Sequence, residues 1–223
     1  MYAKRKSALK RLITVLSMIL VMLMGVAGTL AYLQVQTNDV VNTFAPSNID
    51  LTLAETATEG GSTAANTYKM IPGVDIAKDP KVTVTADIDC YVFVKVVETE
   101  NFDTYMTYAI VSGWKLLNTT TGELTETVNT ADLDEYVLFR EVSASVAKDG
   151  EAFNVLAGST AYPNGVVHIP NTVTKTQMDA LYNEDGTVKT TAQPMLTFTA
   201  YAIQKAGFES DRAGAWTQAQ AQG

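Results

Sequence analysis

VTVTADIDCYVFVKVV, residues 82–97, is the stretch that decides the fold class of this chain. In its first half, Val82 to Asp89, apolar side chains alternate with Thr and Asp, which is typical of a strand with one face in water. In its second half, Cys90 to Val97, both faces are apolar except at Lys95. That pattern indicates a central strand covered on two sides.

The alternating pattern returns on both sides of this stretch. Residues 49–53 and 196–202 alternate as clean strands with one wet face. Weaker strand candidates are Trp114–Leu117, Tyr136–Val142, Ala152–Leu156 and Val166–Ile169. Turn signals stand between them at Pro72-Gly73, Asn164-Gly165 and Asp185-Gly186. About eight strands are therefore expected, in an all-β, jelly-roll-like antiparallel β-sandwich.

Helices are expected to be few and short. Thr174 and Gln177 form a T-x-x-Q capping box, so we expect one helix to start there. A second helical turn is expected after Ser210. The Thr/Ala/Gly/Ser-rich segment 55–67 is expected to be a mobile loop, and residues 217–223 a flexible tail.

The N-terminus has the layout of a secretory signal, a hydrophobic helix preceded by positive charge. Five Lys and Arg residues precede an apolar run that starts at Leu12. Small side chains at Thr29 and Ala31 favour cleavage between Ala31 and Tyr32, and Gly25–Ala27 offers a second cleavage point. The alternative is an uncleaved anchor, because 22 residues from Leu12 to Leu33 carry no charge.

These features predict four segments and an extracellular location. They are a signal peptide at 1–31, an N-terminal segment at 32–47, a β-sandwich domain at 48–216 and the tail at 217–223. Contact with a membrane is expected only through the signal segment. Removal of residues 1–31 leaves 11 Lys and Arg against 24 Asp and Glu, a net charge of −13. Nucleic acid is therefore excluded as a partner, because it requires basic patches.

Side chains for catalysis are scarce. His168 is the one histidine, so no H-E-x-x-H zinc site exists, and Cys90 is the one cysteine, so no internal disulfide forms. Cys90 is expected to be a buried strand residue rather than a nucleophile paired with His168. The acidic pairs Asp87/Asp89, Asp132/Asp134 and Asp149/Glu151 lack a calcium-loop pattern and are interpreted as solvated turn residues. We expect no enzyme activity, no metal and no cofactor.

Three stretches together resemble the TasA/camelysin family, exported proteins of Gram-positive bacteria that are processed by a SipW-type signal peptidase. The stretches are GTLAYL at 28–33 followed by NTF at 42–44 and NIDLTL at 48–53, MIPG at 70–73 with KDP at 78–80, and TAYAIQ at 199–204 with GF at 207–208 and AW at 215–216. Residues 99–190 match less well.

The resemblance implies a jelly-roll domain at the cell surface or in a biofilm matrix, which in some members polymerises by inserting the N-terminal segment of one subunit into the sheet of the next. Here the apolar residues of the donated segment would be Tyr32, Leu33, Val35, Val40, Val41 and Phe44. The partners would be other copies of the chain or other matrix proteins. The alternatives are that this segment pairs within its own subunit or is disordered. Two alternatives for the function are a non-polymerising adhesin or binding module and, as the resemblance also implies, a surface metalloprotease.

Overall fold

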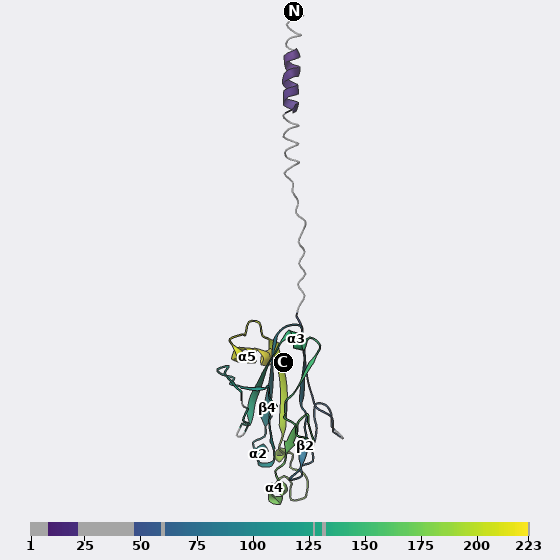
Figure 1. Cartoon of the computed structure of the whole chain (residues 1–223), viewed down its shortest axis with the longest axis vertical. Helices are drawn as coiled ribbons and strands as arrows, with labels where there is room; N and C mark the ends of the chain where they lie inside the picture. The colour runs from purple at the N-terminus through teal and green to yellow at the C-terminus, as the bar shows by residue number, and fades with distance from the viewer. Residues whose placement is uncertain (1–8, 22–46, 59–60, 127, 131–132, 223) are drawn as a thin grey trace, which may run out of the picture. The chain divides into compact units, whose positions relative to one another are not determined.

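The computed structural model describes residues 9–21, 47–58, 61–126, 128–130 and 133–222. The chain divides into two compact units, 1–45 and 46–223, which are described separately. In the first unit residues 9–21 are helical (Figure 1). None of the helices in the described residues is long and apolar enough to cross a membrane.

The second unit is β-rich and mostly antiparallel, with eleven strands in three sheets across its described residues. The strands are β1 (Ile49–Ala54), β2 (Asp75–Ala77), β3 (Lys81–Ala86), β4 (Cys90–Glu98), β5 (Thr107–Tyr108), β6 (Lys115–Leu117), β7 (Leu124–Thr125), β8 (Glu135–Val142), β9 (Glu151–Asn154), β10 (Val166–His168) and β11 (Leu196–Gln204). All eight strands expected from the sequence are present. The count of eight was too low because β2, β5 and β7 are too short to show a period of two.

The largest sheet has five strands in the order β11-β4-β8-β6-β7. Strand β4 pairs antiparallel with β11 on one side and β8 on the other. Its Val92, Val94 and Val96 are fully buried on one face, and Tyr91 and Phe93 are buried on the other. The prediction of a central strand covered on two sides is therefore confirmed.

Helix α5 (Arg212–Gln222) covers the Tyr91 and Phe93 face of this sheet. The ring centroid of Trp216 lies 5.5 Å from that of Phe93 and 5.2 Å from that of Tyr201. The expectation of a flexible tail is wrong for residues 217–222, which continue the helix, and Ala219 is buried. The Gln/Ala-rich composition suggested fraying, but Ala and Gln are also good helix formers, and the packing of Ala215, Trp216 and Ala219 holds the helix in place.

The opposite face of the five-stranded sheet shares a core with the sheet β1-β3-β9. Val82 and Val84 of β3 are fully buried in the same cluster as the valines of β4. The third sheet, β2-β10-β5, belongs to a separate cluster around Phe102 and Leu156. The prediction of a β-rich chain is thus confirmed at the level of strands and sheets.

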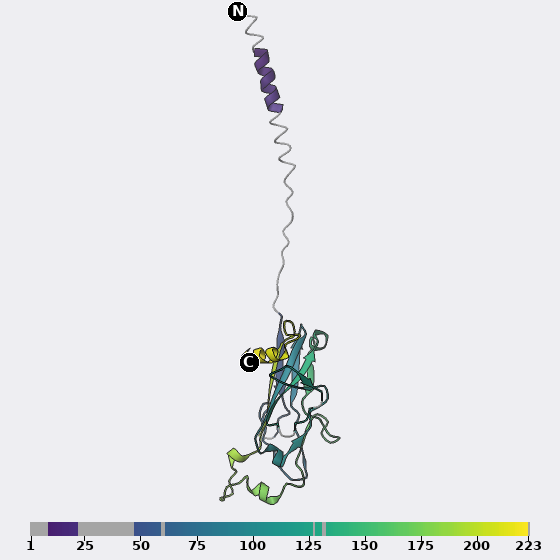
Figure 2. The same cartoon turned by 90° about the vertical axis from the view of Figure 1, so that its left-hand side faces the viewer.

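The remaining helices are short: α2 (Phe102–Tyr105), α3 (Ala144–Ala147), α4 (Lys175–Asp179) and the 3-10 turn η1 (Thr190–Ala192). The capping box predicted at Thr174 and Gln177 is present and starts α4. Figures 1 and 2 show α5 toward one end of the domain and α4 at the opposite end. Near β10, Gly165 has φ of 148°, and a Cβ there would lie 2.2 Å from the Lys78 carbonyl oxygen, so this turn requires glycine.

Candidate functional site

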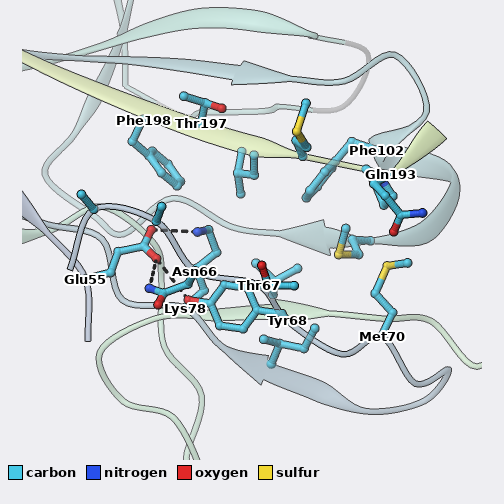
Figure 3. A pocket seen from close by; sticks show the side chains of 18 of the residues that line it. Glu55, Asn66, Thr67, Tyr68, Met70, Lys78, Phe102, Gln193, Thr197 and Phe198 are labelled. Atoms are coloured by element: carbon cyan, nitrogen blue, oxygen red, sulfur yellow. Dashed lines mark hydrogen bonds and ion pairs between the residues drawn. The ribbon is translucent and has the colours of Figure 1, made fainter. Parts of the chain in front are cut away.

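A cavity of ≈ 680 Å³ opens beside the end of β1 and the beginning of β11 (Figure 3). The chain segment 63–68 and residues of β2 and α2 complete its wall. A volume of this size lies within the range of small-molecule sites in proteins. The cavity is therefore the main candidate site of the described residues.

One wall of the cavity is apolar. Phe102 and Met106 are buried there, and Ile76, Leu196 and Phe198 are partly buried against the same cluster. These side chains come from β2, from β11, and from α2 with Met106 directly after it, so three separate parts of the sequence build the wall. Such a surface attracts the apolar part of a ligand, because each buried CH₂ group contributes roughly 0.8 kcal/mol.

The facing wall is a polar cluster centred on Glu55, whose carboxylate accepts three hydrogen bonds. Lys78 Nζ lies 2.7 Å from Oε1, Tyr68 Oη lies 3.1 Å from Oε2, and Asn66 Nδ2 lies 3.3 Å from Oε2 (Figure 3). The side chains of Lys78 and Glu55 are only 12% and 15% exposed. An ion pair this enclosed is held in one geometry because each partner would otherwise be a poorly solvated charge.

Two aromatic rings flank the Lys78 ammonium. Its Nζ lies 5.3 Å from the ring centroid of Tyr68 and 5.4 Å from that of Phe198, both within cation–π distance. Burial raises the pKa of the Tyr68 hydroxyl, and the charge of Glu55 raises it further. Tyr68 therefore stays protonated and donates its hydrogen bond to Glu55 over the whole physiological pH range.

The loop that carries this wall is tied down in its described part. The Glu55 amide donates to the Thr63 carbonyl at 2.9 Å, Asn66 Oδ1 accepts from the Thr58 amide at 2.9 Å, and Asp79 accepts from both the amide and the hydroxyl of Thr56. The sequence correctly indicated a loop, and the structure adds that these residues are anchored by hydrogen bonds. Composition could not show that Asn66 and Asp79 would anchor it.

A second buried carboxylate lies at the end of β4. Glu98 is 6% exposed, accepts a hydrogen bond from Tyr108 Oη, and Tyr108 Oη lies 2.5 Å from Tyr136 Oη. Burial raises the pKa of Glu98 to about 7, and the nearby charges of Asp103 and Asp134 act in the same direction, while the bond from Tyr108 opposes them. A sequence signal existed, because Glu98 continues the inward positions of Cys90, Val92, Val94 and Val96.

The two residues weighed as a nucleophile and base lie in different sheets. Cys90 pairs with Val142 and Gln204, whereas His168 pairs with Thr107 and Asp75. Cys90 is fully buried, and burial raises the pKa of its thiol to about 11, so the reactive thiolate is disfavoured. The structure does not bring the pair together.

His168 has a carboxylate neighbour instead. Its Nδ1 lies 2.6 Å from Asp75 Oδ1, and half of the His168 side chain is exposed. The described residues contain no group of three or more His, Cys, Asp or Glu side chains arranged to hold a metal ion.

The described aspartates of one acidic pair serve as local hydrogen-bond acceptors. Asp87 accepts from the amide of Asn48 at 3.1 Å, and Asp89 accepts from the amide of Ala144 at the start of α3 at 2.8 Å. A carboxylate at that position stabilises the first turn of a helix. These contacts give the two acids a role in the turn around them.

The free edge of β11 is a third candidate feature. Among the described residues β11 pairs only with β4. The residues just beyond the two ends of β11 show which backbone groups bond to β4. The Met195 carbonyl accepts from the Thr99 amide, and the Lys205 amide donates to the Asp89 carbonyl, so the odd-numbered residues face β4. In an antiparallel ladder, alternate residues direct their backbone N–H and C=O groups to opposite sides of the strand. The residues whose backbone groups point away from β4, toward the free edge, are therefore Leu196, Phe198, Ala200, Ala202 and Gln204.

The residues predicted for processing and assembly lie outside the described residues. They are Thr29, Ala31 and Tyr32 for signal cleavage, and Tyr32, Leu33, Val35, Val40, Val41 and Phe44 for assembly. Sequence reasoning in turn missed the cavity, because its wall combines residues separated by more than one hundred positions.

Comparisons with protein-family models, with curated proteins and with solved structures find no match to this chain. The interpretation of the sites therefore rests on their geometry and on the sequence patterns.

Proposed function

We propose that this chain is an exported structural protein of the cell surface or extracellular matrix that assembles by strand addition. The observation that carries the proposal is the free edge of β11, a nine-residue strand with one unpaired side among the described residues. The domain would be a jelly-roll-like antiparallel β-sandwich, and its action would be non-catalytic.

The composition of β11 supports an edge that accepts a partner. Natural proteins protect exposed edge strands with charges, proline, bulges or shortness. Strand β11 has the sequence LTFTAYAIQ, which contains no charge and no proline. An edge of this length and composition presents backbone groups that another extended segment could pair with.

A second edge strand lies beside it. Strand β1 pairs only with β3 among the described residues, and β1 contacts β11 although the two belong to different sheets. Both sheets therefore end on the same side of the domain. A donated segment there could bond to one edge while its alternate side chains contact the other.

The donor in this proposal is the segment 32–47 of another copy, freed by cleavage after Ala31. Its backbone hydrogen bonds would each contribute only about 1 kcal/mol net, so its apolar residues would supply most of the affinity. A donor and an acceptor on different parts of one chain form a heterologous contact, which yields filaments when the rotation does not close. The resemblance to the TasA/camelysin family supports the same mode of assembly.

The test is electron microscopy of the exported chain beside a variant that lacks residues 32–44. We expect fibres from the first and folded monomers from the second. If both preparations form the same fibres, strand donation by this segment is wrong. If neither forms fibres across pH and salt, the chain is a non-polymerising binding module, the second candidate, which the cavity favours. Loss of any proteolytic activity on His168→Ala would instead support the surface protease.

A further inference from the structure

The cavity is rich in methionine. The chain has eight methionines, of which four follow residue 31, and three of these four line the cavity: Met70, Met106 and Met195. Met178 is the fourth and lies outside the lining. Methionine has a flexible, polarizable side chain and is common at surfaces that adapt to varied apolar ligands. The concentration of methionine at one site points to a ligand with an apolar body.

The charges of the lining select the type of polar group on that ligand. Glu55 and Lys78 are the two charged residues of the lining, and they neutralise each other at 2.7 Å. A carboxylate ligand would add a second negative charge beside Glu55 in a chain that is already acidic. An ammonium ligand would approach Lys78 and would find a Glu55 carboxylate that already accepts three bonds. Binding of either charged head group therefore has an unfavourable free-energy contribution, from desolvation and repulsion, that a neutral head group lacks.

The lining also contains neutral polar groups. Four threonine hydroxyls line the cavity, those of Thr63, Thr67, Thr190 and Thr197. The side-chain amides of Asn66 and Gln193 also line it, but their N–H groups already donate within the chain, so the threonine hydroxyls are the main neutral groups for a ligand. Such groups bind alcohol or carbonyl oxygens without a change in net charge. Figure 3 shows Asn66, Thr67 and Tyr68 on the side of the ion pair, with Phe102 and Phe198 across the cavity.

We propose that the cavity binds a small neutral amphiphile, with an alcohol or carbonyl head near Glu55 and Lys78 and an apolar chain against the methionines. The volume of ≈ 680 Å³ is sufficient for such a molecule. This binding goes beyond assembly. The cavity is complete within one chain, although Leu196 and Phe198 of its lining belong also to the β11 edge that the proposed assembly uses.

The test uses the full chain labelled with ¹³C at the methionine methyl groups, with each signal assigned by a single Met→Leu substitution. Three probes share one chain length and differ in head group: decanol, decanoate and decylammonium. We expect decanol to give saturable shifts of the Met70, Met106 and Met195 signals and to bind at least tenfold more tightly than the charged probes. Equal affinity for all three heads, or shifts confined to methionines outside the lining, would overturn the proposal.

Two variants locate the ligand. Thr67→Trp places a large ring at an exposed position of the lining and should weaken decanol binding at least tenfold, whereas Thr119→Trp, on an exposed turn away from the cavity, should leave it unchanged. Glu55→Gln removes the negative partner of Lys78, so decanoate should gain at least tenfold relative to decanol. Equal effects of the two tryptophans, or no gain for decanoate in a folded Glu55→Gln variant, would contradict the proposed site.

Discussion

Two buried regions of this domain differ in how completely they are filled. The α5 cluster, formed by Tyr91, Phe93, Phe139, Ile203 and Trp216 with their neighbours, is packed ring against ring, with centroids 5.1–5.6 Å apart along Tyr91, Phe139, Phe93 and Trp216. The cavity cluster, formed by Phe102, Met106, Leu156, Ile169 and their neighbours, borders an open volume and an enclosed ion pair. The first region is filled by packed rings, and the second retains space and an enclosed ion pair that a tightly packed core would eliminate.

The sharpest contrast is expected from truncating one side chain in each region. Trp216→Ala should lower the free energy of unfolding by about 3–5 kcal/mol, because it empties a filled site in the α5 cluster. Met70→Ala should cost less than about 2 kcal/mol, because Met70 already borders the cavity. Urea denaturation of the two variants measures both values. Equal losses would show that the cavity wall is packed as tightly as the α5 cluster.

The next largest effect is expected from Glu98, which should make the free energy of unfolding depend on pH. Its pKa is about 7 in the folded chain, above the ordinary value of 4.5, so the folded state holds the proton longer than the unfolded state. The contribution of Glu98 to stability should be fully present below about pH 4.5 and should be lost as pH rises to about 7, by about 3 kcal/mol in total. Glu98→Gln should remove this slope, because the amide stays neutral and can still accept from Tyr108. A slope of the same size in Glu98→Gln would assign it to other groups.

Breaking the ion pair of the cavity wall should have a somewhat smaller effect. Lys78→Met leaves the enclosed Glu55 carboxylate without its cation and should destabilise the fold by about 2–3 kcal/mol. The double variant Lys78→Met with Glu55→Gln should recover to within about 1 kcal/mol of the parent, because no charge then remains uncompensated. Thermal and urea unfolding of the three proteins measure the coupling. A double variant as unstable as the single one would contradict this account of the pair.

The smallest effect is expected at the exposed pair of His168 and Asp75. Removal of the imidazole in His168→Ala should change the free energy of unfolding by less than about 0.5 kcal/mol, because an exposed hydrogen-bonded pair contributes little. The pair at Lys78 and Glu55 has a similar separation but is far less exposed, so we expect the larger loss of stability there. A loss at His168 as large as that at Lys78 would make burial the wrong explanation.

The sequence predicted the parts of this fold that depend on local periodicity. The alternation in residues 82–97 located β3 and β4, and the capping box at Thr174 located α4. The same local reasoning failed at residues 217–222, because the burial of Ala219 depends on a sheet face formed by distant strands. The very short strands β2 and β5 were not predicted for a similar reason, because they form only by pairing with β10, which is distant in sequence.

The cavity could not be predicted, because it exists only where β1, β2, α2 and β11 meet. Each of its residues looked ordinary in the sequence, and Lys78 belonged to a turn. The burial of Glu98 could have been predicted, because this residue continues the alternation of the inward-facing valines of β4. Three-dimensional proximity, rather than residue type, therefore gives Glu55 and Lys78 their significance.

The free edge of β11 is the basis of the proposed assembly, and one substitution tests it most directly. Ala200→Pro removes an amide that points away from β4, so the ladder with β4 should remain, whereas Ala200→Val retains the amide. We predict, by electron microscopy of the exported chain, fibres from the parent and Ala200→Val and only folded monomers from Ala200→Pro. Fibres of unchanged form and yield from Ala200→Pro would contradict the claim that β11 accepts the donated strand.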